Sequence, residues 1–171
     1  IENGFHEFYL SVNYLKELII DYFGDGSKWG INIKYLEESQ PLGTAGSLTL
    51  LPKNISHPFI VINGDVLTKF NLSKILEFHK LNNAVATLAV RQYVLNVPFG
   101  VVETDGIAIK RLVEKPNYQK NVNAGVYALN PDIFDYLGKG KLDMPELFQE
   151  LIDHNKKIIA CPIHEYWIDI G

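Results

Sequence analysis

The sequence predicts an α/β fold with a mixed, mainly parallel sheet and helices on both faces of the sheet. The first half of the chain alternates β-like apolar runs with segments of helical periodicity, which is the pattern of βαβ units. Residues 59–63 (FIVIN) form a nearly continuous apolar run, as in a parallel strand buried on both faces. The second half adds signals of antiparallel pairing, so the predicted sheet is mixed.

Length and composition indicate one domain over residues 1–171. The chain has 171 residues, 47% hydrophobic and 21% charged, with a formal net charge of -4. The negative charge argues against a nucleic-acid or anionic-membrane surface, so neither partner is expected. No apolar run approaches the ~20 residues of a membrane span, and no signal peptide is visible. A single cysteine, Cys161, cannot form an internal disulfide. We expect a cytoplasmic protein.

Strands in the first half are predicted where apolar residues run together, and helices where they recur at helical spacing. Asn13 is expected to cap the first helix and Gly24 to end it. Pro52 ends a second, short helix, and Asn71 caps a third. The predicted strands are residues 8–12, 31–36, 59–63 and 84–90, and the predicted helices are residues 14–23, 44–51 and the segment after residue 71.

The second half carries a hairpin signal and a helix start signal. The Asp-Gly pair at 105–106 is typical of a tight hairpin turn. Asp143 and Glu146 have the spacing of a capping box, which predicts a helix reaching residue 153. Ligands bind beyond the carboxyl ends of the strands in sheets of this kind, so residues that follow strands are site candidates. The predicted strands are residues 99–103, 107–112, 124–129, 157–162 and 165–168.

Two aspartates follow predicted strands. Asp65 comes after the run 59–63 through Gly64, and the glycine lets a ligand approach the backbone. Asp169 also follows a strand, near the end of the chain. Two carboxylates on neighbouring loops can share one Mg²⁺, which prefers carboxylate oxygens and substrate phosphates. Two unrelated turn aspartates are the alternative.

A segment of small residues lies between a predicted strand and a short helix. Small residues there allow backbone N–H groups to face a ligand, and a helix N-terminus favours negative or polar groups. An ordinary strand-to-helix turn accounts for the same residues. The segment consists of Leu42, Gly43, Thr44, Ala45 and Gly46.

Two further segments carry polar residues at strand ends. Lys115, beside Glu114, can contact a phosphate as a point charge, although an ordinary surface ion pair is the simpler explanation. Asn123 opens a strand and is followed closely by Gly125. Its amide offers both a donor and an acceptor to sugar hydroxyls. A turn residue is the alternative for Asn123.

Taken together and in this order, these segments resemble the sugar-1-phosphate nucleotidylyltransferases, and most closely the mannose-1-phosphate guanylyltransferase-like branch. The resemblance extends over nearly the whole chain and implies a Rossmann-like, nucleotide-diphospho-sugar transferase-like fold. The matching segments are SVNYL (11–15), YFGDGS (22–27), ESQPLGTAGSL (38–48), INGDV (62–66), PFGVV (98–102), VEKP (113–116), NAGVY (123–127) and WIDIG (167–171).

The resemblance implies transfer of a nucleotidyl group from a nucleoside triphosphate to a sugar-1-phosphate, with GTP favoured by the PLGTAG segment. In such a reaction positioning and charge neutralisation dominate. By resemblance, Asp65 and Asp169 hold Mg²⁺, and Lys115 pairs with the sugar phosphate. The implied sugar contacts are Gly100, Glu114, Asn123 and Gly125, and the implied base and ribose contacts are Leu42, Gly43, Thr44, Ala45, Gly46 and Gly64.

The chain also departs from the family pattern. The family opens with a glycine-rich loop that carries an arginine and is followed by a lysine, and this sequence begins past that point. We therefore expect an N-terminally truncated domain that is a poor catalyst alone. Because the absent unit includes a strand, we also expect exposed strand edges and homo-oligomers. A non-catalytic nucleotide-sugar-binding or regulatory subunit is the main alternative. A glycosyltransferase fits the EKP and NAGVY segments less well.

Overall fold

The largest sheet of the computed structural model, which describes residues 1–171, has the strand order β3–β8–β5–β9. β8 pairs antiparallel with both β3 and β5, whereas β5 and β9 are parallel. Three strands therefore point one way and β8 opposes them from inside the sheet, so the mixed α/β class is confirmed. The bounds are β3 (Phe59–Ile62), β5 (Ala86–Asn96), β8 (Asn117–Leu129) and β9 (Ile158–Pro162).

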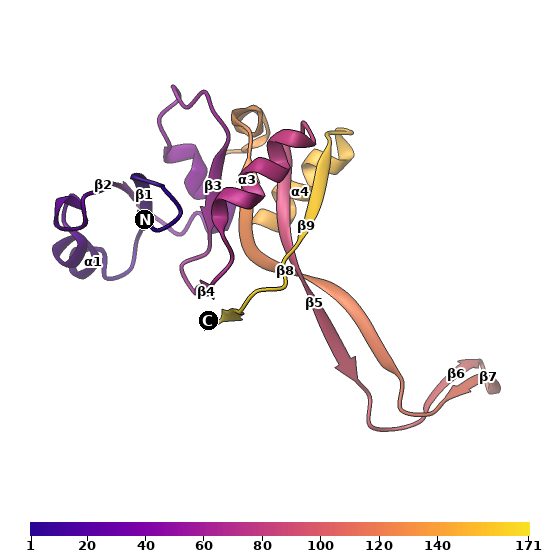
Figure 1. Ribbon diagram of the computed structural model, residues 1–171. Coiled ribbons are helices and arrows are strands. Elements are labelled where there is room, and N and C mark those ends of the chain that lie inside the picture. Colours follow the sequence, from indigo (N-terminus) through magenta and orange to yellow (C-terminus); the bar gives the residue numbers. More distant parts are fainter.

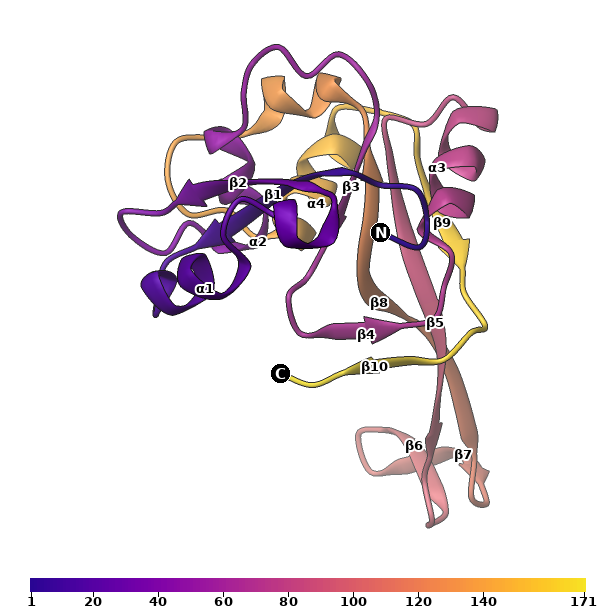
Figure 2. The ribbon, with the colours of Figure 1, turned by 60° about the vertical axis from the view of Figure 1, so that its left-hand side comes forward.

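The remaining strands form three separate pairs. β1 (Glu7–Val12) and β2 (Asn32–Glu37) are parallel, and no hydrogen-bonded pairing joins them to the central sheet. β4 (Val66–Thr68) and β10 (Trp167–Asp169) are antiparallel and lie side by side in Figure 2. β6 (Val101–Asp105) and β7 (Ala108–Val113) form the predicted hairpin. Parallel pairing is thus limited to β1–β2 and β5–β9, because β8 separates β3 from β5.

Four α-helices accompany the sheets: α1 (Lys16–Phe23), α2 (Gly43–Gly46), α3 (Leu72–Leu81) and α4 (Met144–Asp153). α3 and α4 begin as predicted, with the side chain of Asn71 accepting from the Ser73 N–H and with a complete capping box at Asp143. The predicted helix 44–51 is divided into α2 and a 3₁₀ turn, Ser47–Leu50. Two further 3₁₀ turns cover Ser27–Trp29 and Pro131–Tyr136.

The predicted cap of the first helix is wrong. Helix α1 begins only after Leu15, which adopts a left-handed backbone with φ 54°. The side chain of Asn13 instead donates a hydrogen bond of 2.9 Å to the carbonyl of Glu38. A distant backbone acceptor therefore takes the amide that the sequence pattern assigned to the helix start.

The two faces of β8 belong to two hydrophobic cores. Tyr127 and Leu129 pack in one core with the buried residues of α4. Val126 and Ala128, which alternate with them along the strand, pack in the other core with Ile75 of α3. The helices therefore cover opposite faces of the sheet, as predicted.

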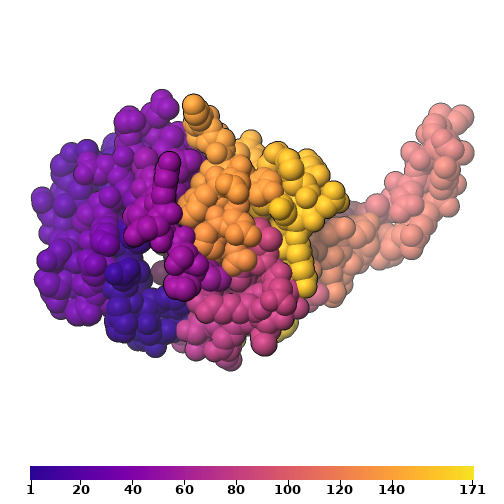
Figure 3. Space-filling model, turned by 90° about the horizontal axis from the view of Figure 1, so that it is seen from above, coloured from indigo at the N-terminus to yellow at the C-terminus, as the bar shows by residue number.

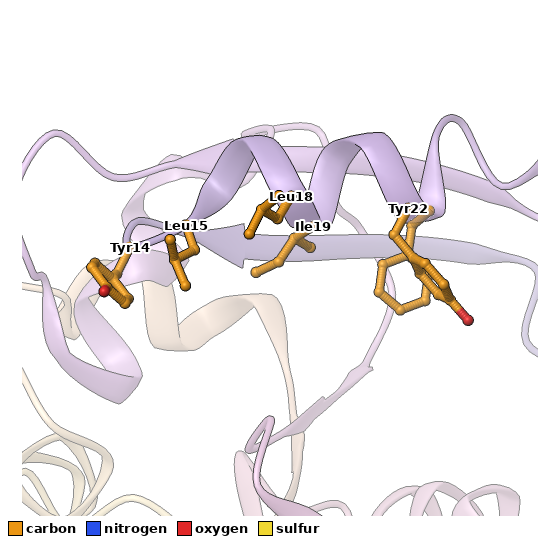
Figure 4. A pocket seen from close by; sticks show the side chains of 6 residues that line it. Tyr14, Leu15, Leu18, Ile19 and Tyr22 are labelled. Atoms are coloured by element: carbon orange, nitrogen blue, oxygen red, sulfur yellow. The ribbon is translucent and has the colours of Figure 1, made fainter.

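The amino-terminal helix contributes no residue to either core. None of its side chains is buried, and Leu18 and Tyr22 are 63% and 66% exposed. Figure 4 shows Tyr14, Leu15 and Ile19 lining an open hollow together with these residues. Such a contiguous apolar surface is unusual on an isolated domain. No helix in the structure is long and apolar enough to cross a bilayer.

A long two-stranded arm leaves the body of the molecule (Figures 1 and 3). It consists of the outer halves of β5 and β8 and ends in the β6–β7 hairpin, where Ile107 is fully exposed. Both strands are therefore longer than the predicted 84–90 and 124–129. The residues of β8 in the arm, from 117 to 121, are mostly polar and carry no alternating apolar pattern that would have predicted a strand.

Leu147 provides a test of the packing of α4. It is fully buried in the larger core, so Leu147→Ala should lower the free energy of unfolding by about 2–5 kcal/mol. Ile152→Ala is the matched control, because Ile152 lies on the same helix but is 49% exposed, and it should change stability by less than about 0.5 kcal/mol. Urea unfolding followed by circular dichroism measures both values. Equal losses would contradict the assignment of the core.

Candidate active site

Asp65 lies in the turn between β3 and β4. The turn is closed by a hydrogen bond of 3.2 Å from the Val66 N–H to the Asn63 carbonyl. The Asp65 side chain is half-buried, and its Oδ1 atom is buried without any hydrogen-bond partner. An unpartnered buried carboxylate oxygen is costly in a folded protein, and it marks a position where a ligand would satisfy it.

Asp169 reaches the same place from the other end of the chain. Its strand, β10, pairs with β4 so that Asp169 lies opposite Val66. The Ile170 N–H donates to the Asp65 carbonyl at 2.9 Å, and the Gly171 N–H donates to Asp169 Oδ1 at 3.0 Å. A Cβ atom at Gly171 would lie 2.6 Å from Asp65 Oδ2 and 3.3 Å from Asp169 Oδ1. The two carboxylates therefore converge on one glycine, through the antiparallel β4–β10 pair and not at the carboxyl edge of a parallel sheet.

The base of the site is formed by β8. The carbonyl of Gly125 accepts from the Asn63 N–H at 2.9 Å, and the carbonyl of Ala124 accepts from the Trp167 indole at 2.8 Å. Gly125 has φ +67°, and a Cβ atom there would lie 2.8 Å from Val66 Cγ2. This position therefore requires glycine, both for its backbone and for the close approach of the turn that carries Asp65.

The Asn123 side chain is engaged within the protein. Its Oδ1 accepts from the Gly125 N–H and its Nδ2 donates to Tyr127 Oη, both at 2.8 Å. Burial raises the pKa of Tyr127 above its usual value, the hydrogen bond from Asn123 opposes this shift, and the charge of Asp65 adds to it. Tyr127 thus lies within electrostatic reach of the Asp65 carboxylate.

The N–H groups of the small-residue segment are not free for a ligand. The Thr44 N–H donates to Asp143 Oδ1, and the N–H groups of Ala45 and Gly46 donate to the Leu142 carbonyl. The expectation that the N–H groups of residues 44–46 face a ligand is therefore wrong, because Leu142 and Asp143, just before α4, already accept their hydrogen bonds. Leu42 and Gly43 lie at the partly exposed start of the segment, and nothing lies within 4 Å of a Cβ built at Gly64.

The predicted sugar-phosphate contacts lie on the arm. Lys115 is exposed with φ 45°, and its N–H donates to the Phe99 carbonyl at 3.2 Å. A Cβ atom at Gly100 would lie 3.1 Å from Glu114 Oε2, so these residues form one cluster at the outer end of β8. The strand from residue 117 to residue 125 spans about 26 Å. The structure therefore does not bring Lys115, Glu114 and Gly100 to the two carboxylates.

Three contributors to the site were not predicted. The Asn63 N–H ties the Asp65 turn to β8, the Tyr127 hydroxyl accepts from Asn123, and Glu38 accepts hydrogen bonds from the Ser11 hydroxyl and the Leu42 N–H at the small-residue segment. Glu38 and Tyr127 both belong to segments that the resemblance singled out, so their place in those segments was the available signal. Their contacts are long-range or depend on a strand irregularity, which the sequence pattern does not show.

The model of the nucleotidyl transferase family matches residues 1–171. The chain belongs to this family. It is 33% identical over 181 residues to a probable mannose-1-phosphate guanylyltransferase 1 of Oryza sativa, covering 99% of this chain. It is 34% identical over 177 residues to a mannose-1-phosphate guanyltransferase of Yarrowia lipolytica, covering 98% of this chain. This nucleotidyl transferase chain spans about half of each relative, 50% and 48% of their lengths.

Solved structures support the same assignment. The crystal structure of HddC from Yersinia pseudotuberculosis matches with a TM-score of 0.74 and 25% identity, covering 99% of this chain and 75% of that one. The same protein complexed with GMP-PN matches with a TM-score of 0.73 and 26% identity, over the same shares of both chains. A putative glucose-1-phosphate thymidylyltransferase from Bacillus anthracis, at 17% identity and a TM-score of 0.69, supports the fold alone and covers 94% of this chain and 69% of that one.

Nucleotidyl transferases generally use a divalent cation, and the residues of this site fit one. The donor set is two carboxylates that converge on Gly171, and one of their oxygens is buried and unpartnered. The structure contains no cluster of three or more His, Cys, Asp or Glu side chains that would form a complete protein cage. Two carboxylates with room for substrate oxygens are the donor set of a cation that is shared with a phosphate.

Gly43 provides a test of the contact between the small-residue segment and α4. It has φ +79°, and a Cβ atom there would lie 2.6 Å from both Asp143 Oδ1 and the Leu142 carbonyl. Gly43→Ala should therefore lower the free energy of unfolding by more than about 1 kcal/mol. Gly138→Ala is the control, since nothing lies within 4 Å of its Cβ position. If thermal unfolding shifts both variants equally, the close contact at Gly43 is not the cause.

Proposed function

We propose that the protein containing this chain transfers a nucleotidyl group from GTP to a sugar-1-phosphate, releasing pyrophosphate. The observation that carries the proposal is the pair Asp65 and Asp169, which converge on Gly171 with one unpartnered buried oxygen. The names of the relatives and the GMP-PN complex of HddC favour guanine as the base. The same relatives favour mannose as the sugar.

In the proposed reaction an oxygen of the sugar-1-phosphate attacks the α-phosphorus, and the bond from that phosphorus to the pyrophosphate oxygen breaks. Asp65 and Asp169 would hold the cation, for which Mg²⁺ is the proposed ion because it binds one or two carboxylates together with substrate phosphates. When bound, such an ion neutralises charge that develops on phosphate oxygens. The protein's own part is to hold the two carboxylates at a fixed separation, so that the reacting groups are positioned before reaction.

The remaining predicted residues have more limited roles in this proposal. Leu42, Gly43 and Gly64 lie at partly exposed positions, where a base and ribose can approach the backbone. Lys115 is exposed on the arm and can pair with a sugar phosphate as a point charge. Lys115 lies next to residue 117, and β8 runs about 26 Å from there to residue 125 beside the Asp65 turn. The pairing therefore requires the arm to fold back over the two carboxylates.

Pyrophosphate release tests the proposed activity. Full-length protein with GTP, mannose-1-phosphate and Mg²⁺ should release pyrophosphate, and the other nucleoside triphosphates should react at least about tenfold more slowly, because a missing hydrogen bond to the base leaves buried polar groups unpaired. A coupled pyrophosphate assay measures the rates, with the sugar phosphate omitted as control. If the nucleotide sugar binds but no combination of substrates turns over, the non-catalytic alternative is correct.

Replacing either carboxylate tests the cation site. Asp65→Ala and Asp169→Ala should each reduce Mg²⁺-dependent turnover of the full-length protein by at least about 100-fold, since charge stabilisation at the reacting phosphate is lost. Because Asp65 Oδ1 makes no hydrogen bond, its removal should not lower the melting temperature. Glu77→Ala, an exposed carboxylate on α3, is the control and should keep the wild-type rate. A near-normal rate in either aspartate variant would remove that residue from the site.

A further inference from the structure

The strand β8 contains an irregularity at the point where the arm joins the body. Leu88 of β5 lies opposite Tyr127, whereas Val90 lies opposite Asn123. Between these two pairs, β5 contains two residue steps and β8 contains four, so β8 has two extra residues. The extra residues form a bulge around Gly125, whose positive φ of +67° gives β8 its local change of direction.

The bulge supports both carboxylate-bearing elements. Ala124 and Gly125 are consecutive residues, and their carbonyls accept hydrogen bonds from two different elements of the site. The Trp167 indole, at the start of the strand that ends in Asp169, donates to Ala124. The Asn63 N–H, at the start of the turn that carries Asp65, donates to Gly125. The bulge therefore supports the two carboxylate-bearing elements from below, in addition to the β4–β10 pairing that joins them directly.

The side chain of Asn123 bridges the bulge. Asn123 Oδ1 accepts from the Gly125 N–H, which closes a local turn across the bulge. Asn123 Nδ2 donates to Tyr127 Oη on the far side of the bulge. Tyr127 is only 2% exposed, and its ring packs against Phe148 of α4 with the ring centroids 5.7 Å apart. The amide of Asn123 is thus anchored to the hydrophobic core through Tyr127.

We propose that Asn123 is a positioning residue for the cation site, acting with Tyr127 through the bulge at Gly125. The inference rests on the proposed function, because it concerns the cation that Asp65 and Asp169 would hold. The role differs from the sugar contact that the resemblance implied for Asn123, because both polar atoms of its amide have partners within the protein. Gly125 likewise serves the close approach of the Asp65 turn, against Val66 Cγ2 and Asn63 Nδ2.

Direct Mn²⁺ binding tests this proposal. In the full-length protein with nucleotide present, Asn123→Ala should weaken Mn²⁺ affinity by about 10-fold or more, the size seen when groups that orient metal ligands are removed. Tyr127→Phe removes only the hydroxyl and should weaken Mn²⁺ affinity in the same direction but less. The KM for the sugar-1-phosphate should stay near the wild-type value in both variants. Electron paramagnetic resonance of free Mn²⁺, compared with the same nucleotide without protein, measures the affinity without relying on turnover.

Asn121→Ala is the matched control. Asn121 lies on the same strand two residues away, is exposed, and pairs with Gln92 in the arm rather than with the site. It should leave Mn²⁺ affinity unchanged. Circular dichroism checks that each variant is folded, and Tyr127→Phe decides the question if Asn123→Ala does not fold.

Two results would overturn the proposal, and they are distinguishable. Unchanged Mn²⁺ affinity together with a raised KM for the sugar-1-phosphate in Asn123→Ala would make Asn123 a sugar contact. Absence of Mn²⁺ binding by the wild-type protein itself would remove the cation site, and with it the metal-dependent part of the proposed function.

Discussion

The pairing of β8 with two neighbours is the constraint on which the rest of the structure depends. β8 runs against β3 and β5 from inside the sheet, so its alternating side chains must enter two different cores. Any shift of register by one residue would exchange Tyr127 and Leu129 with Val126 and Ala128. Because large side chains face α4 and small ones face α3, such an exchange would overfill one core and leave space in the other. The register of β8 is thereby fixed, and the position of the bulge with it.

The candidate site depends on the fixed position of β8. The Asp65 turn and the strand that carries Asp169 come from parts of the chain about 100 residues apart. Both donate hydrogen bonds to neighbouring backbone carbonyls of β8. One hydrogen bond from each segment joins it to the central sheet, and the β4–β10 pairing joins the two segments to each other. The backbones of both carboxylate residues are held in this way, with Asp169 exposed and Asp65 half-buried.

The sequence predicted those parts of the fold that depend on local chemistry. Asn71 and Asp143 cap their helices as expected, and the Asp-Gly pair at 105–106 forms its hairpin, because each signal acts within a few residues. Asp65 and Asp169 were singled out because each was expected to follow a strand, and ligands bind beyond strand ends in α/β sheets. They do meet at Gly171, but the antiparallel pairing of β10 with β4 brings them together, which the sequence pattern did not show.

The failures of prediction come from long-range competition for polar groups. Asn13 was expected to cap a helix, but the Glu38 carbonyl takes its amide from 25 residues away. The N–H groups at Thr44 and its neighbours were expected to face a ligand, but Asp143 accepts from Thr44 across 99 residues. Sequence patterns describe what a group can bind locally, and they do not show which distant acceptor the fold will bring to it. The outer part of β8 was not predicted for a different reason. Its side chains face solvent on the arm and not a core, so they show no alternation of apolar and polar residues.

The arm has a consequence for how this protein can change over evolutionary time. Its outer strands pack on nothing, and their side chains, including the ion pair between Lys110 and Asp105, are solvent-exposed. Substitutions there alter neither core nor the register of β8 inside the body, so they carry little cost in global stability. Residues beside the outer end of β8, with Lys115 among them, can therefore be substituted without unfolding the body that holds Asp65 and Asp169. The sequence of the arm can in this way vary over evolution while the body of the domain keeps its fold.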